Sequence, residues 1–195
     1  MSPRRIVFLL AGLLAVSIVV SWPDVSAQAE TNNQSQTATS KQDPPFTLIG
    51  KSKHGHPVIE FFYRGDRYEM EISANDSRRR EGMGNRAQFL PNTGMIFVHT
   101  SDDTRSYWMR GCMFDIDLLF LDRSGTVVAA HQMKREPAQV PGENTRSYTN
   151  RLKKYLSNKP ARYALEFPPG TIERLNIKPG EVIALPHRRL QQMAR

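Results

Sequence analysis

The sequence predicts a mostly β fold of the α+β class, a small antiparallel-rich barrel-like or sandwich domain with two or three short helices. Many short runs of β-branched and aromatic residues indicate strands. Glycine and proline recur between these runs and indicate turns. The strands do not alternate with long amphipathic helices, which argues against a doubly wound parallel sheet.

The positions of these turns divide the chain into the following expected strands and helices. Strands are expected at 58–62, 68–72, 95–98, 106–109, 116–121, 126–131, 161–167 and 181–185. Short helices are expected from Asp76 or Ser77 to Arg80, around Leu152, Tyr155 and Leu156, and near 171–175. Between 133 and 150 the pattern is lost, so this stretch is expected to be a long polar loop.

The N-terminus has the features of a secretory signal peptide. Arg4 and Arg5 precede the apolar stretch 6–20, and Val25-Ser26-Ala27 offers the small residues of a cleavage site. The alternative is an uncleaved anchor, but the apolar stretch is shorter than the ~20 residues that a spanning helix needs. We therefore expect cleavage after Ala27 and export to the periplasm or the extracellular space, with no stable membrane span afterwards.

The rest of the chain divides by composition. Residues 28–45 are rich in Gln, Asn, Ser and Thr and are expected to form a disordered linker. Residues 46–186 are expected to form a single globular β-rich domain, and residues 187–195 a basic C-terminal tail.

Charge and cysteine content restrict the possible partners. The formal net charge is +8, which favours anionic components of a cell envelope. No nucleic-acid partner is expected, because the arginine runs at 78–80 and 188–189 lack interleaved aromatic residues. Cys112 is the only cysteine, so no intramolecular disulfide forms, and its apolar neighbours favour a small core residue over a nucleophile.

Four blocks of the sequence carry a family resemblance. They are Arg80-Glu81-Gly82-Met83-Gly84-Asn85-Arg86, Gly94 to Val98, Tyr107 to Arg110 with Asp117 and Phe120-Leu121-Asp122, and Tyr163 to Glu166 with Gly170-Thr171 and 177–180. In this order they resemble the family of domain of unknown function 192 (DUF192). The resemblance implies a compact, mostly β, barrel-like domain that is often exported in bacteria. It implies no reaction and no catalytic residues.

This chain departs from the family pattern at three places. Gly84 stands where the family commonly has Met, Arg110-Gly111-Cys112 replaces Lys-Asn-Thr, and Asp115 stands where Pro is frequent.

Asp115 and Asp117 are the first candidate site. Residues two apart on a strand share a face, so the two carboxylates are expected side by side. Such a pair suits a hard cation or acid–base chemistry. The competing interpretation is structural: one carboxylate caps a turn or pairs with Arg110 while the other meets solvent.

Arg86, Trp108 and Arg110 are the second candidate set. Guanidinium groups beside an exposed aromatic ring suit a carboxylate, a phosphate or a sugar. The competing interpretation places Trp108 in the core and pairs the arginines with Glu81 or Asp117. The histidines show no ligand spacing, so neither a metal nor a cofactor is expected.

The sequence thus favours a non-enzymatic, exported module of the cell envelope. Its partner would be a small ligand or an anionic envelope component, bound around Arg86, Trp108, Arg110, Asp115 and Asp117. The alternative is an envelope hydrolase, for example a carbohydrate-active one, that uses Asp115 and Asp117.

Overall fold

The computed structural model describes residues 43–195. The signal peptide predicted for 1–27 lies outside the described residues, as does the predicted linker up to residue 42.

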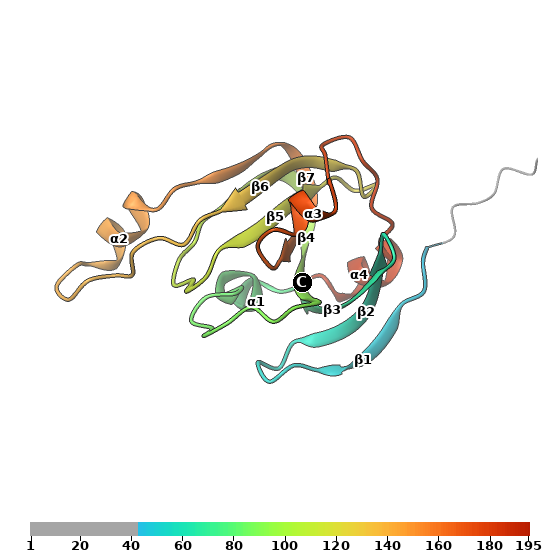
Figure 1. Ribbon diagram of the computed structural model, residues 1–195, viewed down its shortest axis with the longest axis horizontal. Helices are drawn as coiled ribbons and strands as arrows, with labels where there is room; N and C mark the ends of the chain where they lie inside the picture. Colours follow the sequence, from blue (N-terminus) through green and yellow to red (C-terminus); the bar gives the residue numbers. More distant parts are fainter. Residues whose placement is uncertain (1–42) are drawn as a thin grey trace, which may run out of the picture. The chain divides into compact units, whose positions relative to one another are not determined.

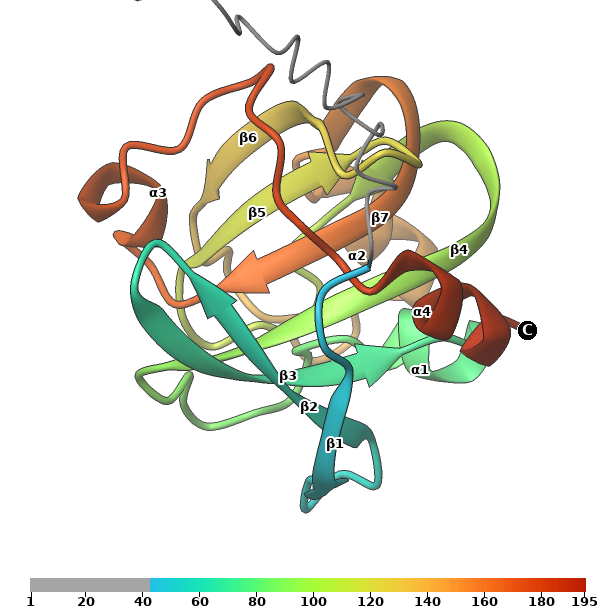
Figure 2. The same cartoon turned by 90° about the vertical axis from the view of Figure 1, so that its right-hand side faces the viewer.

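The described part of the chain is built on one seven-stranded sheet in the order β1-β2-β3-β4-β7-β5-β6 (Figures 1 and 2). The strands are β1 Thr47–Lys51, β2 Pro57–Tyr63, β3 Asp66–Ser73, β4 Thr93–Tyr107, β5 Ile116–Leu121, β6 Val127–Met133 and β7 Tyr155–Phe167. Neighbouring strands are antiparallel except for the parallel pair β3–β4. The predicted mostly β, α+β fold is confirmed.

Two details of that prediction are corrected. Within residues 43–195 the sheet does not close, because β1 and β6 remain at its two edges, so the sandwich-like alternative holds over the barrel-like one. The helices number four in this region rather than two or three: α1 Asp76–Glu81, α2 Thr145–Arg151, α3 Thr171–Arg174 and α4 His187–Met193.

The central strands are covered on both faces, which explains their composition. All six residues of β5 are buried, as expected for a strand between two apolar layers. One layer packs β2 and β3 with the chain after α3 and with α4, and it includes Tyr68, Phe167 and Leu190. The other layer includes Phe97 and Phe120 and lies under the α1–β4 connection and the segment after β4.

The strand predicted at 95–98 and the first two residues of the strand predicted at 106–109 belong to one long strand, β4, which ends at Tyr107. Its pairing with β7 shifts register between Val98 and Asp103 and again between Thr104 and Ser106. The polar residues 101–103 lie in this irregular stretch, where Asp103 is exposed, so the apolar alternation that marks a core strand is absent.

The helix predicted around Leu152, Tyr155 and Leu156 is wrong. Asn144 caps α2 earlier, because its side chain accepts a hydrogen bond from the Ser147 backbone N–H at 2.9 Å. Tyr155 and Leu156 instead begin β7 and pair with the end of β4. Part of the stretch predicted as a loop at 133–150 is therefore helical. Figure 1 shows α2 at the end of the segment between β6 and β7, away from the sheet.

The C-terminal elements also differ from the prediction. The strand predicted at 181–185 reduces to one bridge between Thr126 and Val182. Residues treated as a basic tail form α4, whose Leu190 is fully buried. The one-turn helix predicted near 171–175 is present as α3.

No helix within residues 43–195 is both long enough and apolar enough to cross a membrane.

Candidate functional site

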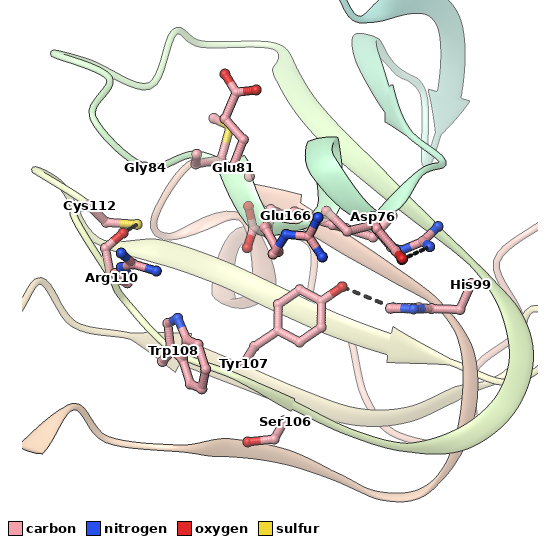
Figure 3. Close-up of a pocket in the computed structure, with 15 residues that line it drawn as sticks. Asp76, Glu81, Gly84, His99, Ser106, Tyr107, Trp108, Arg110, Cys112 and Glu166 are labelled. Carbon is pink, nitrogen blue, oxygen red and sulfur yellow. Dashed lines mark hydrogen bonds and ion pairs between the residues drawn. The ribbon is translucent and has the colours of Figure 1, made fainter. Parts of the chain in front are cut away.

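A cavity of about 350 Å³ lies on the second face of the sheet, between α1 and the segment that follows β4 (Figure 3). Residues from α1 and the turn after it form one wall, namely Asp76, Arg79, Arg80, Glu81 and Met83. The opposite wall comes from the end of β4 and from the residues that follow it. The side chains of Trp108, Arg110 and Cys112 lie on one side of the cavity, His99 lies on the other, and Glu166 lies between them (Figure 3).

Glu166 is the chemically unusual residue of this cavity. On β7 it pairs with Met95 of β4 and Leu118 of β5, which fixes its side chain on the second face of the sheet. It is 5% exposed, and its Oε2 atom is buried without a hydrogen-bond partner in the described structure. Burial raises its pKa to about 8, and the charge of Arg86 offsets only part of that effect.

Tyr107 and His99 form the aromatic part of the wall. The Tyr107 hydroxyl and His99 Nε2 are hydrogen-bonded at 3.1 Å (Figure 3). Burial, together with the charges of Arg105 and Arg79, lowers the pKa of His99 to about 3, so this imidazole is neutral at physiological pH. Burial, assisted by the charge of Glu166, raises the pKa of Tyr107 well above its usual value. At physiological pH the His99 imidazole and the Tyr107 hydroxyl are therefore both uncharged hydrogen-bonding groups.

A tight turn holds Arg110 and Trp108 at the cavity. The Gly111 carbonyl accepts from the Asn85 backbone N–H at 2.8 Å, and the Gly111 N–H donates to the Tyr148 hydroxyl at 3.0 Å. Gly111 has a φ of +66°, a conformation that favours glycine. Trp108 is 41% exposed, and Lys154 Nζ lies 3.6 Å from its ring centroid. Trp108 is thus a surface residue of the cavity and not a core residue.

The arginines around the cavity differ in how they are engaged. Arg79 donates to the Val98 carbonyl at 2.8 Å and to Asp76 at 2.5 Å. Arg80 and Arg110 have no ion-pair or hydrogen-bond partner for their guanidinium groups among residues 43–195. Both also border a neighbouring hollow of about 580 Å³ that Gln139 and Tyr148 help to line. Two free guanidinium groups therefore stand where the cavity meets the surface.

Arg86 belongs to the scaffold behind the cavity. It is 8% exposed and makes a bidentate ion pair with Glu71 of β3, at 2.7 and 2.9 Å. Burial raises the pKa of Glu71, but the hydrogen bonds and the charge of Arg86 outweigh it, so the pKa lies below its usual value. Both terminal nitrogens of Arg86 are engaged by Glu71, while its buried Nε atom has no partner within the described residues. Arg86 does not line the cavity, so it acts on Glu166 through its positive charge.

Asp115 and Asp117 are engaged by different partners, away from the cavity. Asp117 is 2% exposed, and its Oδ2 atom accepts the Ile172 backbone N–H of α3 at 2.7 Å. Burial raises its pKa, and hydrogen bonds from the start of α3 act against that shift. Asp115 accepts from the Arg135 backbone N–H at 2.8 Å and from Lys134 Nζ at 2.9 Å, and these contacts lower its pKa. Asp117 thus fastens α3 to β5.

Cys112 is buried at the edge of the cavity. Burial, together with the nearby charge of Glu166, raises the pKa of its thiol to about 12. The thiol is therefore protonated at physiological pH and is not an activated nucleophile. Within residues 43–195, no three histidine, cysteine or acidic side chains are grouped so that they could hold a metal ion.

The cavity thus unites only part of the set predicted from the sequence. Trp108 and Arg110 line it, Arg86 supports it, and Asp115 and Asp117 lie elsewhere. The central residue, Glu166, was not singled out. One feature of the sequence could have indicated Glu166: it is the only acidic residue in the apolar run 163–167. In the structure this run lies in β7, where all five residues are buried.

Comparison with known proteins gives the family and the fold. The model of the family DUF192, described as an uncharacterized ACR, matches residues 60–185. No curated protein matches the chain.

Two solved structures are similar. A protein of unknown function from Novosphingobium aromaticivorans DSM 12444 is 20% identical, with a TM-score of 0.55 over 75% of this chain and 96% of that chain. A protein from Sinorhizobium meliloti 1021, described as a candidate transcription regulator, is 26% identical, with a TM-score of 0.49 over 64% of this chain and 88% of that chain.

Proposed function

The chain belongs to the uncharacterized family DUF192. We propose its function from its own site: it is a non-enzymatic binding module of the cell envelope that binds, in the Glu166 cavity, a small molecule with an anionic group. The observation that carries this proposal is that Arg80 and Arg110 border the same cavity as the Glu166 carboxyl, and that none of these three groups is fully satisfied within residues 43–195. Folded proteins rarely leave such a carboxyl unsatisfied without a functional reason.

The size and the walls of the cavity support a small ligand. A volume of about 350 Å³ lies at the lower end of the ~300–1,000 Å³ that is usual for ligand pockets. Trp108, Tyr107 and Phe97 supply aromatic surface, and the two guanidinium groups supply a fork of donors for a carboxylate or phosphate.

The absence of a complete catalytic set supports binding over catalysis. Cys112 is protonated, and the carboxylates of Asp115 and Asp117 are held by other partners. Tyr107 and His99 do pair a hydroxyl with an imidazole, but burial raises the pKa of the phenol and lowers that of the imidazole to about 3, so this pair is not an activated nucleophile. The hydrolase alternative therefore gains no support from Asp115 and Asp117.

The proposed location in the envelope rests on the sequence of the N-terminus alone. The charged start, the apolar stretch and the small residues before Gln28 support export and cleavage after Ala27. Cell fractionation with N-terminal sequencing checks it, and an uncleaved chain in the cytoplasm would refute it.

The binding proposal is tested by isothermal titration at pH 7 with inorganic phosphate, glycerol 3-phosphate and acetate. We expect saturable binding of at least one of these anions with a Kd in the millimolar range or below. Arg110→Ala is expected to weaken that binding at least tenfold, about 1.4 kcal/mol, because a charge-assisted contact is lost.

Arg123→Ala is the matched control, since Arg123 is exposed on the turn after β5 and lies outside the cavity. Equal affinities of the Arg110 and Arg123 variants, or no binding of any anion, would refute the proposed function.

A further inference from the structure

The geometry of the cavity points to a more specific ligand, and this inference rests on the proposed function. We infer that the cavity selects a small zwitterion, whose organic ammonium group lies against Glu166 and whose carboxylate or phosphate group lies against Arg80 and Arg110.

The ammonium group follows from the unsatisfied carboxyl. Glu166 Oε2 is buried and has no donor within the described structure, although the side chain borders open space (Figure 3). A simple anion placed there would meet a like charge or a bare carboxyl oxygen. A primary ammonium group carries three donors and a positive charge, so beside the carboxyl it stabilises the ionised form.

The walls beside Glu166 suit such a group. Phe97 and Tyr107 stand in an edge-to-face arrangement, with ring centroids 5.1 Å apart, and both border the cavity. Aromatic rings attract organic cations, and more strongly where water is excluded. The aliphatic part of a short amine would contact Met83 and the same rings.

The anionic group follows from the charges that remain after internal pairing. Arg79 is neutralised by Asp76. Glu81 lies 3.8 Å from the buried His56 ring, but burial lowers the pKa of this imidazole, so His56 is uncharged and Glu81 offsets one of the remaining arginines. Arg80 and Arg110 are left with no acceptor in the region described. The cavity thus presents a buried acidic group and a positive rim, a distribution that a zwitterion complements at both ends and a plain anion at one end only.

The ends of the ligand must be close together. Both charge centres of the protein border one cavity of about 350 Å³, so only a few bonds can separate the ammonium from the anionic group. Phosphoethanolamine and β-alanine have this form, one with a phosphate and the other with a carboxylate, and serve as probes.

The test is isothermal titration of the full chain at pH 8.5, where Glu166 is mostly ionised, with phosphoethanolamine, β-alanine, ethanolamine and inorganic phosphate. We expect at least one zwitterion to bind ten times more tightly than both ethanolamine and phosphate. The better of the two zwitterions identifies the anionic group.

Substitution of Glu166 distinguishes the contribution of the ammonium group to affinity from that of the anionic group. Glu166→Gln is expected to lower the affinity for the zwitterion at least tenfold and to leave the affinity for phosphate unchanged or higher. The exposed Glu173 of α3 gives the matched control, Glu173→Gln, with no change for either probe. Circular dichroism confirms that both variants fold.

Two outcomes overturn the inference. If phosphate binds as well as the zwitterions and Glu166→Gln changes neither affinity, the zwitterion is refuted while the proposed anion-binding function stands. If none of the four probes binds, and none of the anions tested above binds, both fail together.

Discussion

Arg86→Met is expected to lower the free energy of unfolding by about 3–5 kcal/mol, because it leaves the Glu71 carboxylate buried without its partner. The two guanidinium–carboxylate contacts, at 2.7 and 2.9 Å, lie in a region where Arg86 is 8% exposed. The substitution also removes the positive charge that partly offsets the burial of Glu166. Urea unfolding at pH 7, followed by circular dichroism, measures the change.

Two further variants make this prediction specific. Arg67 of β3 is about half exposed and forms two ion pairs, with Glu60 of β2 and with Glu69. Arg67→Met removes both and is expected to cost about 1 kcal/mol or less. The double variant Arg86→Met/Glu71→Met is expected to recover much of the stability, because no buried charge remains unpaired. A single Arg86 variant as stable as the Arg67 variant would show that the pair carries little energy and that Arg86 is free for another role.

Glu166→Gln is expected to stabilise the free protein, and increasingly so as the pH rises. The unfolded chain ionises Glu166 near its ordinary pKa of 4.5, whereas the folded protein retains the proton until about pH 8. Between these values the folded state binds more protons, so stability falls with rising pH, and above pH 8 the loss is complete. Glutamine does not ionise and removes this loss, by about 2–4 kcal/mol at pH 8 and above.

The measurement is a series of thermal or urea unfolding curves from pH 4 to pH 9. The difference between the Glu166 variant and the wild type should be small near pH 4 and should grow up to pH 8. The Glu173→Gln control should show no such growth. A constant difference across the range would mean that Glu166 ionises alike in the folded and unfolded states, which would contradict its burial without a partner.

The part of the fold that follows from apolar alternation could be predicted. In β2, Ile59, Phe61 and Tyr63 face the core in turn, and a turn at Gly65 joins this strand to β3. By contrast, every residue of β1 is exposed, so it carries no alternation, and only its pairing with β2 makes it a strand. Local pattern fails where long-range pairing decides the structure.

The contrast between local pattern and long-range pairing also explains which residues of the site could be predicted. Trp108 and Arg110 could be chosen because aromatic and charged residues next to each other in the sequence attract attention. Glu166 becomes significant only when β4 and β5 flank it and α1 covers its face, which is information about distant segments. Asp117 is the opposite case. It is conspicuous in the sequence, but in the structure it binds the backbone at the N-terminus of α3 and lies outside the cavity.

The central claim is that this cavity binds a ligand beside the buried and incompletely hydrogen-bonded carboxyl of Glu166. The pKa of Glu166 tests this claim most directly. The carboxyl carbon shift of Glu166, followed by NMR from pH 4 to pH 10, should give a pKa of about 8 in the free protein. Phosphoethanolamine or β-alanine should lower it by at least one unit, because an ammonium group beside the carboxyl favours the ionised form. A pKa near 4.5 in the free protein, or one that neither zwitterion changes, would contradict the account.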